Sequence, residues 1–147
     1  MLLCLNVAAV VNCLRIVNKH NARRHTVGAL VFNGPDEQLI SGLVMGAAGG
    51  IGGTYGVMPK LYVELYRCVK AGEMAKALDI QNDCCRIIYK MCSGHGNMYG
   101  MIKEILRING GPDCGSVRLP LAELIEADLP IAQECAKMIR EAIAASF

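Results

Sequence analysis

Two short apolar runs, one on each side of a predicted helix, constrain the fold of this chain most. Val27–Phe32 is apolar and ends at the turn sequence Asn-Gly-Pro (33–35), which predicts a buried strand. The apolar spacing within 39–44 predicts a helix, and the glycine-dense stretch Gly46–Gly56 has room for a very short strand at Gly50–Gly52. A strand, a helix and a second strand in this order predict parallel pairing. Because two strands cannot bury a parallel sheet on both faces, the pattern is typical of the end of a larger α/β fold.

The rest of the chain predicts four helices with apolar residues three and four positions apart. Pro59 is typical of a helix start and Gly72 of a helix end. The next helices are predicted over Glu73–Cys92 and Tyr99–Ile108, and Asp128 is predicted to cap the last one. The buried faces of the first two helices are predicted to contain Leu61, Leu65, Tyr66 and Val69, and Met74, Leu78, Cys84, Cys85, Ile88 and Met91.

Composition excludes several classes of protein. The length of 147 residues is that of one ordinary domain, and 53% hydrophobic with 19% charged residues excludes a disordered chain. A formal net charge of +2 and the absence of Trp argue against a nucleic-acid partner. No apolar run reaches the ~20 residues that a membrane-spanning helix needs. We therefore expect neither nucleic acid nor a membrane as a partner.

The N-terminal segment differs in charge from the rest of the chain. Residues 1–35 contain four basic side chains and no acidic one, so 11 basic and 13 acidic side chains remain for 36–147. A secretory signal has its positive charge before the apolar stretch, whereas here the charge follows it. We therefore expect residues 1–26 to be a poorly specified or unrelated segment and residues 27–147 to form the fold.

The eight cysteines indicate a reducing compartment. They form no CxxC pair, and several occupy apolar helical positions, so reduced and mostly buried thiols are expected. The three histidines have no zinc-type spacing to these cysteines, and no metal or cofactor is expected. The compartment that fits this reading is the cytoplasm.

Three features are candidates for chemistry, and each also has a structural explanation. The stretch 49–56 could bind phosphate, but the dinucleotide spacing fails at Tyr55, which leaves close packing as the better explanation. Asp36 and Glu37 follow a strand end, where carboxylates can accept hydrogen bonds from substrate hydroxyls or favour a helix start. His95 has no acid or nucleophile beside it in the sequence and is interpreted as part of a connecting loop.

Three segments resemble the N-acetylneuraminate lyase branch of the dihydrodipicolinate synthase family. They are Val31–Glu37, Ser41–Ala47 and Gly49–Tyr55, and the resemblance extends from about Leu30 to the C-terminus. It implies the C-terminal part of a (β/α)8 barrel, with Val27–Phe32 as strand seven and Gly49–Ile51 as strand eight, followed by C-terminal helices.

The resemblance also implies a class I aldolase chemistry and a substrate site. In the family a barrel lysine forms a Schiff base with a 2-keto acid, and a tyrosine transfers protons. The resemblance places the polyol part of a 2-keto sugar acid at Gly34, Asp36 and Glu37, and Gly53 at a position where the lyases have a substrate-binding serine.

The residues that would catalyse the reaction are not found in this chain. The resemblance places the lysine near residues 10–13, where there is none, and the tyrosine and the carboxylate-binding motif belong to earlier strands. We therefore expect a partial barrel that is inactive alone and that forms homo-oligomers or aggregates. One alternative is a half-barrel interaction module that associates with copies of itself or with an N-terminal half. A small nucleotide-binding α/β protein is the other.

Overall fold

The computed structural model describes residues 2–4 and 30–147 and divides the chain into two compact units. Of the described residues, the first contains 2–4, 30–52 and 63–81, and the second contains 53–62 and 82–147. The predicted boundary at residue 26 lies outside the described residues.

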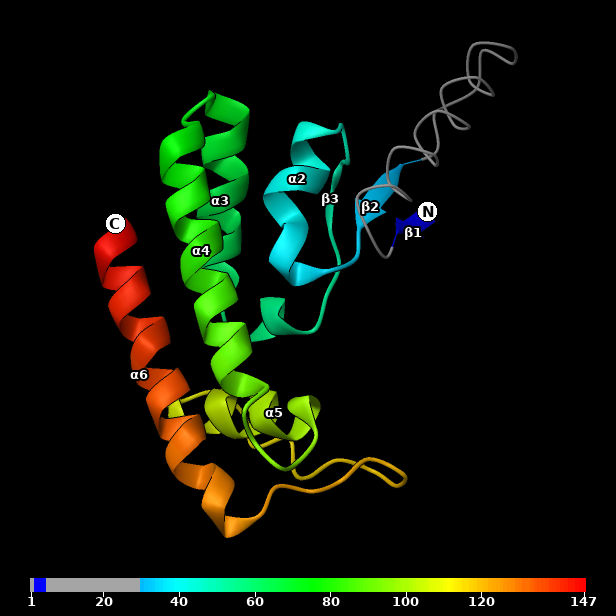
Figure 1. The fold of residues 1–147 in the computed structure, drawn as a ribbon, viewed down its shortest axis with the longest axis vertical. Helices are drawn as coiled ribbons and strands as arrows, with labels where there is room; N and C mark the ends of the chain where they lie inside the picture. The colour runs from blue at the N-terminus through cyan, green and yellow to red at the C-terminus, as the bar shows by residue number, and fades with distance from the viewer. Residues whose placement is uncertain (1, 5–29) are drawn as a thin grey trace. The chain divides into compact units, whose positions relative to one another are not determined.

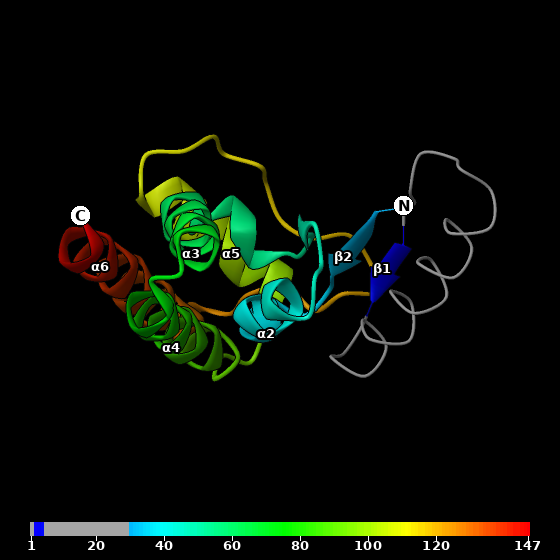
Figure 2. The same cartoon turned by 90° about the horizontal axis from the view of Figure 1, so that it is seen from above.

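The first unit contains a parallel sheet of three strands in the order β1-β2-β3. These are β1 (Leu2–Cys4), β2 (Val31–Asn33) and β3 (Gly49–Gly50), and Figures 1 and 2 show β1 next to β2. A 3-10 turn, η1 (Asp36–Gln38), and helix α2 (Leu39–Val44) connect β2 to β3. The strand-helix-strand order predicted from the sequence is therefore present.

The strand bounds differ from those predicted. β2 begins at Val31, and the predicted strand residues 27–29 lie outside the described residues. β3 begins one residue before the predicted 50–52 and lies within the range 49–51 that the resemblance implied. β1 was not predicted, because three residues carry too little pattern and a strand of this length is defined by its pairing partner. Leu2 pairs with Val31 and Cys4 with Asn33.

Four longer helices follow, as predicted, but Asp128, which was predicted to cap the last of them, makes no side-chain capping bond to it. The helices are α3 (Pro59–Ala71), α4 (Met74–Met91), α5 (Met98–Ile108) and α6 (Leu129–Ser146), with the 3-10 turns η2 (Thr54–Gly56) and η3 (Glu126–Asp128). Gly72 separates α3 from α4 with a φ of +78°, a backbone conformation that favours glycine. None of the helices in the described part of the chain is both long and apolar enough to span a membrane.

The buried faces of α3 and α4 are partly those predicted. Leu61, Leu65, Cys84, Ile88 and Met91 are buried as expected. The predictions for Tyr66, Met74 and Leu78 are wrong, because these side chains are exposed and the buried face includes Tyr62, Ala77 and Ile80 instead. Parts of the buried faces of α3 and α4 are thus shifted by about one residue position from the predicted ones. Hydrophobicity alone does not detect this shift, because the observed buried faces include small and amphipathic residues.

In the first unit, ion pairs join α3 to the start of α4. The Arg67 guanidinium bonds both carboxylate oxygens of Glu64 and also reaches Glu73, and Lys76 Nζ lies 2.7 Å from Glu64 Oε1. The hydrogen bonds from Arg67 and Lys76 lower the pKa of Glu64 to about 2. These pairs fix the turn at Gly72.

Candidate functional site

The candidate site lies where the parallel strands β2 and β3 end. Ile51 N donates to Asn33 O at 3.0 Å, so the chain beyond β3 continues alongside the end of β2. Gly34 and Pro35 follow β2, and η1 then presents Asp36 and Glu37. In parallel α/β folds ligands bind at this edge of the sheet.

Asn33 is fully buried and shapes the turn that carries the acidic residues. Its side-chain Nδ2 donates to Pro35 O at 2.6 Å. A β-carbon at Gly42 would lie 2.6 Å from Asn33 Oδ1, so only a glycine in α2 accommodates this side chain. The turn after β2 is therefore stabilised by the side chain of Asn33, which in turn packs against Gly42 of α2.

The structure places the predicted residues Gly34, Asp36 and Glu37 in different environments. Asp36 is buried, with 7% of its surface exposed, whereas Gly34 and Glu37 are half-buried. The Asp36 carboxylate lies against the backbone of Gly52, which directly follows β3 and Ile51. The two strand ends thus meet through Asp36.

Gln81 on α4 binds the same turn, a contact that sequence reasoning missed. Its Nε2 donates to Asp36 O at 3.1 Å, and its Oε1 accepts from Ile40 N at 3.0 Å. Both ends of the buried amide are thereby used to connect η1 and α2 to a helix more than 40 residues further along the chain. A buried glutamine inside a helical pattern was the available signal, but its partners cannot be read from spacing.

Gly53, the fourth predicted site residue, belongs to the second unit. There a β-carbon at Gly53 would lie 3.1 Å from Tyr99 Cε1 and 3.5 Å from Ile102 Cδ1, so α5 covers this glycine. The neighbouring Thr54 is buried and its Oγ1 lies 2.9 Å from the Tyr62 hydroxyl.

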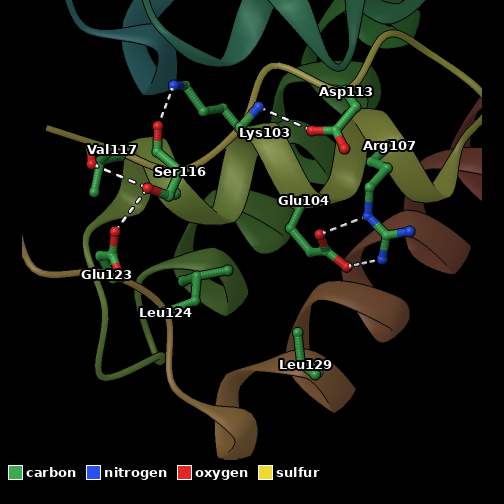
Figure 3. Close-up of a pocket in the computed structure, with 11 residues that line it drawn as sticks. Lys103, Glu104, Arg107, Asp113, Ser116, Val117, Glu123, Leu124 and Leu129 are labelled. Carbon is green, nitrogen blue, oxygen red and sulfur yellow. Dashed lines mark hydrogen bonds and ion pairs between the residues drawn. The ribbon is translucent and has the colours of Figure 1, made fainter.

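The second unit also contains a pocket of about 270 Å³ between α5 and the segment 113–124. Figure 3 shows its charged groups paired within the protein: Lys103 Nζ donates to Ser116 O, and the Arg107 guanidinium binds Glu104. The hydrogen bond from Arg107 lowers the pKa of Glu104. These groups hold the loop in place, and sequence reasoning did not single them out.

His95 lies in the loop between α4 and α5, as predicted, and it has an acidic partner that its sequence neighbours did not indicate. The buried carboxylate of Asp128 lies 3.1 Å from His95 Nδ1 and also accepts the backbone N–H groups of His95, Gly96 and Ile125. The backbone N–H groups of His95 and Ile125 make the largest contributions to a pKa of about 2 for Asp128. The prediction missed this pair because 33 residues separate its members.

The six cysteines whose side chains are described are all free. Three of the six are buried, namely Cys68, Cys84 and Cys135, while Cys92 and Cys114 are exposed. The prediction of mostly buried thiols is therefore right for half of these six cysteines. Burial raises the pKa of Cys135 to about 11, which keeps it a thiol at neutral pH. Among the described residues, no group of three or more His, Cys, Asp or Glu side chains converges on a metal-sized site.

Comparison with known proteins identifies the family of this chain. Residues 1–141 match the Dihydrodipicolinate synthetase family, whose members are TIM barrels with C-terminal helices, and the chain belongs to this family. The matched range includes residues 1–26, the segment that we expected to be poorly specified or unrelated.

The similar proteins are named as lyases and aldolases of sialic acid. The chain is 51% identical over 139 residues to the N-acetylneuraminate lyase of Mediterraneibacter gnavus, covering 93% of this chain and 44% of that protein. It is 40% identical over 112 residues to the N-acetylneuraminate lyase of Rhizobium meliloti, covering 76% and 36%. The solved wild-type sialic acid aldolase of Ruminococcus gnavus superposes with a TM-score of 0.82 at 48% identity, covering 90% of this chain and 44% of that one. The chain thus spans less than half the length of these relatives.

Proposed function

We propose that this chain contributes the polyol-binding end of a sialic acid lyase barrel and does not cleave a carbon–carbon bond by itself. In this proposal β2 and β3 are the seventh and eighth strands of the barrel. The observation that carries the proposal is the acidic turn of Asp36 and Glu37 at the carboxyl end of β2, in a chain 51% identical to an N-acetylneuraminate lyase.

The chemistry of this turn suits a sugar acid. Ionised carboxylates only accept hydrogen bonds, and the polyol part of N-acetylneuraminate offers hydroxyl groups that donate them. Ligands of TIM barrels bind at the carboxyl ends of the strands, which is where Gly34, Asp36 and Glu37 stand. We assign the polyol contacts to these three residues and to Gly53.

Three lysines of the described part, Lys76, Lys90 and Lys103, have partners that do not suit Schiff-base chemistry. A lysine must lose its proton before it attacks a keto carbon, and burial or a neighbouring cation promotes this by lowering its pKa. The hydrogen bond with Glu64 instead raises the pKa of Lys76, and that with Glu134 raises the pKa of Lys90. Lys103 is held by two backbone carbonyls, those of Cys114 and Ser116.

Borohydride trapping tests the proposal directly. The purified 147-residue chain, incubated with pyruvate and borohydride, is expected to keep its unmodified mass. The wild-type Ruminococcus gnavus aldolase, treated in parallel, serves as the positive control. A stable adduct on any lysine of this chain would contradict the proposal, and peptide mapping would identify that lysine.

A second candidate function is a half-barrel that assembles with copies of itself or with a separate N-terminal half. The observation that favours it is the exposure of apolar side chains around the sheet: Leu30 is 57% exposed and Ile51 is 42% exposed, next to β2 and β3. Apolar side chains at open strand ends favour association.

The assembly state distinguishes the two candidates. A half-barrel module is expected to elute as one monodisperse complex, alone or with the N-terminal half of an N-acetylneuraminate lyase, and to melt cooperatively. Light scattering and calorimetry measure both properties. A heterogeneous aggregate with a broad transition would contradict the module.

The cellular location is also a proposal. The free cysteines of the described part favour a reducing compartment, and we propose the cytoplasm.

A further inference from the structure

The three atoms that a β-carbon at Gly52 would meet first all belong to the side chain of Asp36. A β-carbon at residue 52 would lie 1.4 Å from Asp36 Oδ1, 2.5 Å from its Cγ and 2.9 Å from its Oδ2. Real β-carbons essentially never lie within 3.0 Å of such atoms. The Asp36 carboxylate therefore occupies the space that a side chain at residue 52 would take.

A second contact fixes Asp36 from its main chain. Gln81, with 3% of its surface exposed, donates to Asp36 O and accepts from Ile40 N. The backbone of Asp36 is thus hydrogen-bonded to α4, while its carboxylate lies against the backbone of Gly52, which follows β3. Gln81 therefore holds the main chain of Asp36, and the space left free at Gly52 is occupied by the carboxylate.

We propose that Gly52 is a positioning residue of the polyol site, acting through Asp36. By carrying no side chain it admits the carboxylate beside the end of β3 and orients its oxygens toward the hydroxyl groups of a sugar acid. The ligand named here rests on the proposed function. The relation between Gly52 and Asp36 stands on the geometry of the first unit alone.

A double-mutant cycle separates positioning from a general structural role. The variants are Gly52→Ala, Asp36→Ala and the combination of both, with Gly56→Ala as matched control, because a β-carbon at Gly56 would meet no atom within 4 Å. Binding of N-acetylneuraminate to the ¹⁵N-labelled chain is followed by NMR. Gly52→Ala and Asp36→Ala are each expected to weaken binding about tenfold or more, while the combination is no weaker than Asp36→Ala alone. Gly56→Ala is expected to leave the affinity unchanged.

Thermal unfolding of the same variants provides a readout that does not depend on the ligand. Gly52→Ala is expected to lower the unfolding temperature in the wild-type background and to have no such effect with Asp36→Ala, because the added β-carbon then enters the vacated space. Equal losses in the two backgrounds, in binding or in unfolding, would overturn the proposal. If the unmutated chain binds no N-acetylneuraminate, the polyol site of the proposed function and the ligand named here are both wrong. The unfolding cycle still decides whether Gly52 positions Asp36.

Discussion

Replacing Asp128 with alanine is expected to lower the unfolding temperature of the second unit by roughly 5–10 °C. The carboxylate is fully buried and accepts the backbone N–H groups of His95, Gly96 and Ile125 at 2.7, 3.0 and 3.1 Å. Alanine would leave these three donors without their acceptor in a place with little access to water, which is among the costlier single changes in a protein. Differential scanning calorimetry measures the shift.

The control is Glu126→Ala, in the same 3-10 turn but exposed, for which a shift below about 2 °C is expected. Acid provides a second check. The pKa of Asp128 is about 2, below its ordinary value of 3.8, so protonation favours the unfolded chain. The stabilisation by Asp128 is therefore complete above pH ~4 and is lost as the pH falls toward 2.

Asp128→Ala should reduce this acid sensitivity without abolishing it, because Glu64 also has a pKa of about 2. An alanine variant with wild-type unfolding temperature and wild-type acid sensitivity would show that the carboxylate does not hold the loop.

The ends of α3 were predictable from the sequence because local chemistry determines them. Pro59 begins α3, and Gly72 follows it with a positive φ. Each of these residues imposes its backbone preference on its own position. No distant partner is needed, so the sequence carries the signal.

The contacts that shape the candidate site were not predictable in the same way. Asp36 and Glu37 could be located as acidic residues after a strand, but the fit of Asp36 against Gly52 depends on how two strand ends meet. The bridge from Gln81 and the pairing of Asp128 with His95 likewise join residues that the fold, and not the spacing, brings together. The sequence alone also does not distinguish Gly52, which lies against Asp36, from Gly56, whose β-carbon would meet no atom within 4 Å.

Truncating Ile105 to alanine is expected to destabilise the second unit by about 2–5 kcal/mol. Ile105 lies on α5, fully buried, and α5 packs against α6. The buried face of α6 includes the small residues Ala132, Cys135 and Ala136. Small side chains have little freedom to move into a new cavity, so the site relaxes poorly and the cost falls toward the upper part of this range. Urea unfolding followed by circular dichroism measures it.

The matched control removes the same atoms from an exposed isoleucine of the same unit. Ile125 is 50% exposed, and its contact with Asp128 uses the backbone N–H, which alanine retains. Ile125→Ala is therefore expected to cost less than about 1 kcal/mol. Equal costs for the two truncations would show that α5 and α6 do not pack through Ile105. A much larger loss of unfolding free energy for Ile105→Ala than for Ile125→Ala would show that the packing of α5 on α6 stabilises this unit. That contribution is separate from the contacts at the strand ends in the first unit.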